Sequence, residues 1–481
     1  MTTAPVPAAQ SLADRAERSK RGSGAQPAAA GLFTGVRLRL WLTKSAFSVV
    51  DQGFTALAGF SVSFLLARWL SPETYGAYAI AFAAYLFICG FHNAIVLEPM
   101  SVYGTARHSS DLRRYFRMQL QVHAVLASAL SAIAVLLAAV VWLLAPRSPL
   151  AGAIFGSALA LPLLLLLWVT RRMCYVLQRP RIALFGSVGC FVTVLAGLYV
   201  LRYLQRLTPF SAFMLTAGGS LLGAILILVR VARRHGGAGH PAGAFAPSVG
   251  APVSWRATLR ENWSYGRWLF GTAILYPVSG QVQMFLAAAF LGLGSAGALR
   301  AMMIPAAVMT QVVSATDLLI LPGFSYDFGR GSLLRMRRKA LLISCALGGA
   351  GLCFALVLLL VAAPAEHLLF SGKFAAYVWL MPVLALIPAI NGFNSGFSAT
   401  LRGSQKPHFD LVANAIAAPV AVISALFLIR AWGLAGAAMS LVVGCATLAF
   451  VNFCSYCHLA LSARGQESAP LPPATSLESA S

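Results

Sequence analysis

Long apolar runs recur along nearly the whole sequence, separated by short polar stretches. Each run holds about 20 residues or more, the length that an α-helix needs to cross roughly 30 Å of hydrocarbon. The pattern therefore predicts twelve membrane-spanning helices. They cover residues 45–66, 75–97, 119–144, 150–170, 182–203, 209–231, 263–291, 298–322, 340–363, 377–400, 411–429 and 433–458.

The composition supports a chain that is embedded in a membrane along most of its 481 residues. Apolar residues make up 59% of the chain, charged residues make up 10%, and the mean hydropathy is +0.78. Soluble domains carry about 25% charged residues, so this chain has too few polar side chains to cover a water-exposed surface. The composition excludes a soluble enzyme, a fibrous protein and a mostly disordered chain. It predicts an all-α polytopic membrane protein.

The distribution of basic residues predicts the orientation of the spans. The chain has 36 Lys and Arg residues against 13 Asp and Glu residues, which gives a net charge of +23. With twelve spans and both termini inside, 29 basic residues fall on the inner side and 7 on the outer side. Basic residues favour the cytoplasmic side of a membrane. The split predicts a multi-pass protein with both termini in the cytoplasm, and it explains the charge without nucleic acid as a partner.

Composition along the chain divides the spans six and six. Runs rich in Gly, Pro, Ala and Ser mark both termini and the segment between spans six and seven, and such runs are typical of disordered tails and flexible linkers. The predicted organisation is a basic cytoplasmic tail (1–40), an N-lobe of six spans (41–233), a cytoplasmic linker (234–262), a C-lobe of six spans (263–460) and a second cytoplasmic tail (461–481).

The two halves resemble each other weakly at a common offset of 221 residues. Gly59 then meets Gly280 and Gly76 meets Gly297, and similar apolar residues precede the second pair. Parallel repeats related by an axis along the membrane normal are typical of transporters, with the substrate site between the lobes. Chance matches in an apolar sequence remain the alternative.

Short motifs that resemble catalytic or cofactor sites have structural explanations. Residues 292–297 match the G-x-G-x-x-G pattern of dinucleotide sites, but that fingerprint needs a preceding strand, and here an apolar span precedes the pattern. This segment is predicted to be the turn between spans seven and eight. Residues 454–458 match a haem-attachment pattern, but they lie at the cytoplasmic end of the last span. We therefore predict no catalytic residue, no metal and no cofactor.

Polar residues at membrane depth mark the candidate substrate cavity, because such residues are costly unless they serve a function. Amide side chains both donate and accept hydrogen bonds, so they suit a hydroxyl-rich ligand. Asp51 is also the candidate for ion coupling. The predicted cavity residues are Asp51, Gln52, His92, Asn93, Gln281, Gln283, Gln311, Asp317, Asn391 and Asn394.

Three basic residues near the ends of spans are candidates for contact with an anionic phosphate: Lys44, Arg267 and Arg300. Long basic side chains that reach toward lipid headgroups are the alternative explanation. The sequence does not decide whether Asp317 and Glu98 line the cavity or lie at the inner boundary between membrane and water. Glu98 directly precedes Pro99.

Three short segments, residues 64–76, 400–407 and 433–438, resemble bacterial polysaccharide exporters. These are the O-antigen-type lipid-linked oligosaccharide flippases of the multidrug/oligosaccharidyl-lipid/polysaccharide exporter superfamily. Residues 64–76 (FLLARWLSPETYG) resemble the segment that closes span one in that family. Residues 400–407 (TLRGSQKP) resemble its inner loop after span ten, and residues 433–438 (GLAGAA) resemble the start of its span twelve.

The resemblance implies two pseudo-symmetric six-helix lobes of the MATE-like fold, with alternating access to a cavity between them. It implies that the protein flips undecaprenyl-diphosphate-linked oligosaccharide units across the bacterial inner membrane for surface or exopolysaccharide biosynthesis, such as that of lipopolysaccharide. The expected partners are this lipid-linked substrate, membrane lipids, and the glycan polymerase and chain-length proteins of the same process. The expected class is a transporter rather than an enzyme.

Three alternatives remain from the sequence. A cation-coupled multidrug antiporter of the same superfamily is favoured by acidic residues such as Asp51 and Asp317. A membrane glycan polymerase or ligase is disfavoured by the short outer loops. A membrane scaffold without transport activity would tolerate substitution of every polar residue in the cavity.

Overall fold

The computed structural model describes residues 35–108, 111–234, 254–329, 333–404 and 408–467, and nearly all of them are helical. Twelve helices in these ranges are long and apolar enough to cross a membrane, as the sequence predicts. The first half comprises α2 (Gly35–Trp69), α3 (Pro72–His92), η1 (Asn93–Leu97), α4 (Glu98–Ala106), α5 (Leu112–Leu144), α6 (Pro149–Val176), α7 (Pro180–Tyr203) and α8 (Pro209–Arg234). The second comprises α9 (Trp255–Leu291), α10 (Leu293–Gly329), α11 (Leu333–Phe370), η2 (Ala375–Tyr377), α12 (Leu380–Gly403), α13 (His408–Trp432) and α14 (Leu434–Glu467).

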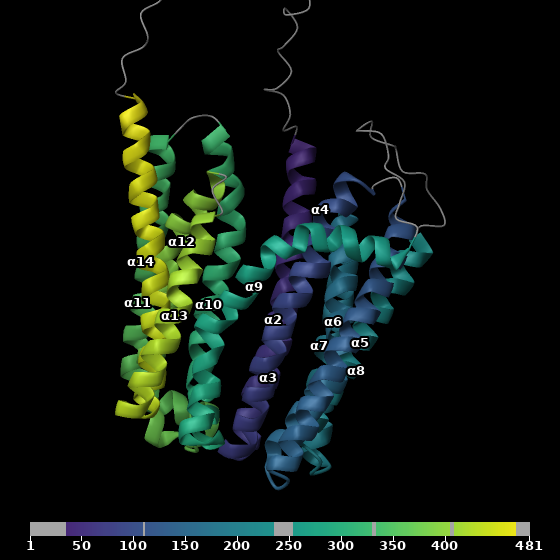
Figure 1. The fold of residues 1–481 in the computed structure, drawn as a ribbon, viewed down its shortest axis with the longest axis vertical. Coiled ribbons are helices and arrows are strands. Elements are labelled where there is room, and N and C mark those ends of the chain that lie inside the picture. Colours follow the sequence, from purple (N-terminus) through teal and green to yellow (C-terminus); the bar gives the residue numbers. More distant parts are fainter. Residues whose placement is uncertain (1–34, 109–110, 235–253, 330–332, 405–407, 468–481) are drawn as a thin grey trace, which may run out of the picture.

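The helices pack as two lobes of six spans each (Figure 1). Within the N-lobe α6 packs against α3, α5 and α8, and within the C-lobe α12 packs against α10, α11 and α14. Helix α2 begins and α14 finishes at the same end of the bundle (Figure 1). We call this the terminal end and the opposite one the far end. The even number of spans explains why the start of α2 and the end of α14 lie at the same end of the bundle.

Local sequence signals account for the sharp ends of the helices. The hydroxyl of Ser71 accepts a hydrogen bond from the backbone N–H of Thr74 at 3.3 Å, and Pro72 follows it at the start of α3. Such caps satisfy N–H groups that the helix itself leaves unpaired. Gly292, with φ of +89°, is the whole turn between α9 and α10, in a backbone conformation that side chains with a Cβ rarely adopt. The predicted turn at residues 292–297 thus reduces to one glycine.

Helical structure extends further than the sequence pattern suggested at three places. Helix α2 starts at Gly35 and α14 runs to Glu467, so each enters a segment expected to be a tail. Helix α9 starts at Trp255, inside the expected linker, because the hydroxyl of Ser254 caps the N–H of Ala257 at 3.3 Å. The rest of the predicted tails and linker, residues 1–34, 468–481 and 235–253, lies outside the described residues.

The two lobes meet at the far end through a close approach of backbones. Gly76 of α3 and Gly297 of α10 lie against each other, and a Cβ on either would overlap a carbonyl oxygen, that of Leu293 or that of Pro72. These two glycines are one of the pairs that match at the offset of 221 residues. One pair of positions that match at this offset therefore lies in direct contact between the lobes.

Two basic side chains join the lobes beside this contact. Arg68, at the end of α2, donates to the carbonyl oxygens of Leu368 and Leu369 of α11 at 2.5 and 3.2 Å. Lys373, after α11, donates to the carbonyl oxygens of Arg68 and Leu70 at 2.5 and 2.9 Å. Each lobe thus supplies a cation to the unpaired carbonyls at the end of the other lobe's helix. Burial lowers the pKa of Lys373, and nearby guanidinium groups lower it further.

Substitution of Gly297 tests the far-end contact. We expect Gly297→Ala to lower the free energy of unfolding by about 1–3 kcal/mol, because the new methyl group forces the backbones of α3 and α10 apart. Thermal unfolding of the detergent-purified protein measures this change.

The matched control is Gly280→Ala, since nothing lies within 4 Å of a Cβ at Gly280. Alanine is the better helix former by about 1 kcal/mol, so this variant should be as stable as the parent or more so. Equal stability of the two variants would contradict the close approach of the lobes at Gly297.

Candidate substrate site

The carboxylate of Asp51 lies fully buried between three helices of the N-lobe. Arg171 of α6 donates to its Oδ2 atom from Nη2 at 2.7 Å and from Nε at 3.3 Å. The hydroxyl of Tyr175 donates to the same oxygen, and the hydroxyl of Ser187 donates to Oδ1 at 2.5 Å. Both carboxylate oxygens are therefore occupied. The ion pair ties α2 to α6 and α7.

This arrangement differs from the predicted exposure of Asp51 to a cavity. The sequence pattern ends span four at residue 170, whereas α6 continues to Val176 and carries Arg171 into the lobe. Arg171 is itself only 4% exposed. A buried carboxylate needs such a partner, because the desolvation of an unpaired charge costs several kcal/mol. A role of Asp51 in ion coupling stays a prediction.

The next residue of α6, Arg172, forms a second polar group that is open to solvent. Its guanidinium donates to Ser101 Oγ at 3.2 Å and to Asn93 Oδ1 at 3.5 Å, and it lies 3.7 Å from Glu98 Oε1. The side chains of Arg172 and Glu98 are 31% and 37% exposed. We call Asn93, Glu98, Ser101 and Arg172 the Arg172 cluster. Its exposed guanidinium can bind an anion, because a planar fork of donors suits phosphate oxygens.

A π-helical turn positions the cluster on the N-lobe. In η1 the N–H of Glu98 donates to the carbonyl oxygen of Asn93, five residues earlier. This wider turn brings the two side chains one above the other, and Asn93 Nδ2 donates to Glu98 Oε1 at 3.4 Å. Single π-turns inside α-helices are frequent at functional sites. In the sequence, this π-helical turn is accompanied by Pro99, which has no backbone N–H to donate within the helix.

Three of the other predicted cavity residues have a polar contact within their own lobe, although His92 Nδ1 and Gln283 Oε1 are buried without a hydrogen-bond partner. His92 Nε2 lies 3.1 Å from Nδ1 of His123, and both rings are buried between α3 and α5. Gln283 is fully buried and donates to the carbonyl oxygen of Ser279 at 3.0 Å. Asn394 accepts a hydrogen bond from Asn452 at 3.1 Å within the C-lobe. His92 and Gln283 thus have no surface facing a cavity in this conformation.

The remaining predicted residues lie apart from the Arg172 cluster. Asp317 of α10 interacts with Ser395 and Arg402 in the C-lobe, and one of its carboxylate oxygens is buried without a hydrogen bond. Gln52 and Gln311 are exposed, and Gln281 and Asn391 are half-buried.

Of the three predicted phosphate contacts, Arg300 lies 5.1 Å above the ring of Phe82 and Arg267 is exposed on α9. Lys44 lies in α2, and its side chain is outside the described residues. Neither Arg267 nor Arg300 belongs to the Arg172 cluster.

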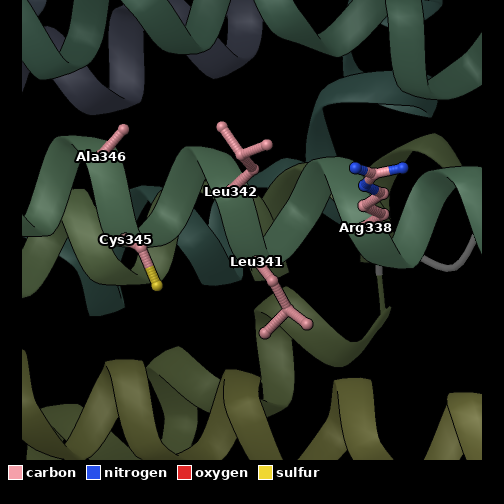
Figure 2. Close-up of a pocket in the computed structure, with 5 residues that line it drawn as sticks. All are labelled: Arg338, Leu341, Leu342, Cys345 and Ala346. Carbon is pink, nitrogen blue, oxygen red and sulfur yellow. The ribbon is translucent and has the colours of Figure 1, made fainter.

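A groove of about 590 Å³ runs along α11. Arg338, Leu341, Leu342, Cys345 and Ala346 line it (Figure 2). All five come from one helix, and four of them are apolar. The groove contains none of the predicted site residues, so it does not define the substrate site.

Sequence reasoning missed Arg171 and Arg172, which carry the two polar groups of the N-lobe. The sequence pattern ends span four at residue 170 and therefore places both in the inner loop that follows. Two consecutive arginines after an apolar run also typically mark the point where a helix reaches the membrane–water interface. Only the continuation of α6 to Val176 shows that they belong to the helix.

The chain matches no protein-family model and no curated protein. It does match solved structures of transporters. The inward-facing conformation of a multidrug resistance MATE family transporter of the MOP superfamily aligns with a TM-score of 0.73 at 12% identity, over 88% of this chain and 100% of that one. The lipid II flippase MurJ in an inward closed conformation aligns with a TM-score of 0.66 at 13% identity, over 87% and 90% of the two chains.

A eukaryotic MATE transporter, AtDTX14, aligns with a TM-score of 0.59 at 14% identity, over 89% of this chain and 99% of that one. At these identities the comparisons show the fold. The chain is a multi-pass membrane protein with the MATE-like transporter fold, which confirms the predicted fold class. The O-antigen flippase family itself is not among these relatives.

The buried ion pair predicts a large effect of a small substitution. Asp51→Asn leaves the guanidinium of Arg171 buried without its counter-charge, so we expect a loss of about 3–5 kcal/mol of folding stability. The double variant Asp51→Asn/Arg171→Met removes both charges and should regain most of this loss. Thermal unfolding of the purified variants measures both values.

Glu73→Gln is the matched control, because Glu73 is an exposed carboxylate at the start of α3. Loss of this negative charge should lower the folding stability by at most about 1 kcal/mol. A double variant no more stable than Asp51→Asn would show that Arg171 does not depend on Asp51 for its burial.

Proposed function

We propose that this protein flips undecaprenyl-diphosphate-linked oligosaccharide units across the bacterial inner membrane by alternating access of its two lobes. The observation that carries the proposal is the Arg172 cluster, a partly exposed guanidinium of α6 held by side chains of η1 and α4. The cluster combines a cation for a phosphate with amide and hydroxyl groups for sugars. The similarity in fold to the lipid II flippase MurJ supports a lipid-linked substrate.

The conformation supports entry of the headgroup from the terminal end. Contacts at Gly76, Gly297, Arg68 and Lys373 join the lobes at the far end. The chain also aligns better with an inward-facing than with an outward-facing MATE conformation, with TM-scores of 0.73 and 0.60. The terminal end then faces the cytoplasm, in agreement with the predicted excess of basic residues on that side.

Translocation requires that the polar headgroup never meets hydrocarbon without hydrogen-bond partners, because each unpaired polar group costs several kcal/mol. The polyprenyl tail stays in the bilayer while the headgroup exchanges water for protein groups. At Arg172, phosphate oxygens replace Glu98, whose negative charge repels the substrate until its side chain turns away. Outward movement of a diphosphate is favoured by the membrane potential, by about 2.3 kcal/mol per charge at 100 mV. No covalent bond changes in this process.

A cation-coupled multidrug antiporter is the second candidate. The observation in its favour is the carboxylate oxygen of Asp317 that is buried without a hydrogen bond, a position that suits a cation. The solved MATE structures also support it. Against it stands Asp51, whose carboxylate is already neutralised by Arg171. Deletion of the gene would then raise drug susceptibility and leave the surface glycan unchanged.

A deletion strain that carries the variants on a plasmid tests the flippase. We expect the deletion to accumulate lipid-linked oligosaccharide on the inner leaflet and to lose surface glycan. Arg172→Gln should rescue poorly, because loss of a charge-assisted hydrogen bond of about 1.5–3 kcal/mol weakens substrate binding by about 10- to 100-fold. Arg172→Lys keeps the charge but not the fork of donors and should rescue in part.

Arg113→Gln controls for the loss of one positive charge, because Arg113 is exposed at the start of α5. It should rescue like the parent, and all variants must reach the membrane in equal amounts. Normal lipid intermediates and a normal surface glycan in the deletion strain would overturn the flippase. Full rescue by Arg172→Gln would remove Arg172 from the site.

A further inference from the structure

The first half of α9 lies across the terminal end of the N-lobe before the helix turns down into the C-lobe (Figure 1). Its inward side is formed by Thr258, Asn262 and Gly266, which are all buried. Residues at this spacing lie on one face of a helix. Gly266 lies against η1, and a Cβ there would lie 2.6 Å from the carbonyl oxygen of Ala94. This half of the helix is therefore part of the N-lobe surface.

Polar contacts hold this face in place. The amides of Asn262 and Gln119 of α5 exchange two hydrogen bonds, at 3.0 and 3.1 Å, and both side chains are fully buried. Glu261 lies 3.0 Å from Nε2 of His108 and 3.4 Å from Arg107. The acidic side chain of this segment is thus turned toward the N-lobe. Glu261 therefore does not neutralise basic residues on the opposite face of the helix.

The outward face of the same segment combines arginines with a tryptophan. Arg256, Arg260, Trp263 and Arg267 follow one another at intervals of four, three and four residues, and all four are exposed. We call them the α9 stripe. Trp263 is 46% exposed and its ring contacts Phe270 at 5.9 Å between centroids. The exposed residues Arg113, Arg114 and Arg117 of α5 add positive charge to the same end of the lobe.

The stripe lies where a bilayer presents its headgroups. The membrane-spanning part of α9 begins at Leu269, two residues after Arg267. Tryptophan favours this boundary, because its ring is apolar and its N–H is polar. An amphipathic segment with arginines on its outer face is typical of helices that lie in the plane of a membrane surface.

We propose that the α9 stripe binds anionic phospholipids of the leaflet at the terminal end. The guanidinium groups of Arg256 and Arg260 contact the phosphates, and the ring of Trp263 inserts between the headgroups. The charge of the stripe excludes a cationic partner, and the exposed tryptophan next to a membrane span favours a lipid surface over a soluble polyanion. Binding does not depend on the proposed flippase activity.

Lipid bound here stabilises the position of α9 on η1, the turn that carries Asn93 and Glu98. The opposite side of the segment reaches this region, since Ser264 Oγ lies 3.3 Å from the hydroxyl of Tyr103 in α4. Occupancy of the stripe therefore acts on the geometry of the Arg172 cluster through one layer of residues.

Native mass spectrometry of the full-length protein in detergent tests the binding. Phosphatidylglycerol and phosphatidylcholine are titrated separately, and inorganic pyrophosphate is added in a third series. We expect phosphatidylglycerol to bind more tightly than phosphatidylcholine. Each arginine near a membrane surface contributes about fivefold, or about 1 kcal/mol, to the binding constant. Arg256→Gln/Arg260→Gln should therefore weaken the tightest phosphatidylglycerol binding by at least about tenfold.

The matched control is Arg147→Gln/Arg206→Gln, which removes two exposed charges at the far end. It should leave the tightest binding unchanged, and thermal unfolding confirms that both double variants remain folded. A second variant, Trp263→Ser, should weaken binding of phosphatidylglycerol without changing the net charge.

Three outcomes would overturn the proposal. The first is equal binding of phosphatidylglycerol and phosphatidylcholine, which would indicate apolar contact alone. The second is an equal loss in the two arginine double variants, which would indicate an effect of net charge. The third is displacement of the lipid by pyrophosphate at equal concentration, which would identify a site for a free anion.

Discussion

Within the hydrocarbon of a bilayer no water is present to satisfy a polar group, and this constraint organises the buried polar contacts of the N-lobe. Asp51 is held by Arg171, Tyr175 and Ser187, and the amides of Gln119 and Asn262 satisfy each other. These contacts do more than neutralise single residues. They join α2 to α6 and α7, and α5 to α9, so most helices of the N-lobe are fixed by interactions that would be costly to break.

The Arg172 cluster departs from this rule, since its groups are partly hydrated and its distances are longer. Arg172 contacts its partners at 3.2–3.7 Å, whereas Arg171 lies 2.7 Å from Asp51. Two adjacent residues of one helix thus differ in kind: the first is locked in a saturated ion pair, and the second can exchange partners. The phosphate of the proposed substrate would displace the partly exposed Glu98 more easily than a buried carboxylate, because Glu98 can be rehydrated when it leaves Arg172.

The sequence predicted the parts of this structure that depend on hydrophobic length and charge. The twelve spans followed from the length and spacing of the apolar runs. The contact of Gly76 with Gly297 did not, because the weak match of the two halves says nothing of which positions touch. The site was predicted only in part. Asn93 lies in the Arg172 cluster, but His92 beside it pairs with His123, a contact that no local pattern signals.

The reason is that side-chain pairing depends on which helices become neighbours. The sequence pattern places Arg171 in the loop after span four, and its partner Asp51 lies 120 positions earlier in the chain. A helix that continues beyond its apolar run, as α6 does, moves such residues from a loop into the lobe. The period of the apolar residues does not report this extension, because the last turns are already polar.

Helix α9 is the element through which movement of the lobes must pass. Its first half is fixed to the N-lobe by Asn262 and Gly266, and its second half packs against α13 and α14 of the C-lobe. In the proposed alternating access, opening of the far-end contacts would bend α9 beyond its first half. Pro277 lies in the second part and lacks the N–H that would stiffen the helix, so bending costs least there. Because the first half moves with the N-lobe, any lipid bound to its outer face would favour one angle of that bend over the others.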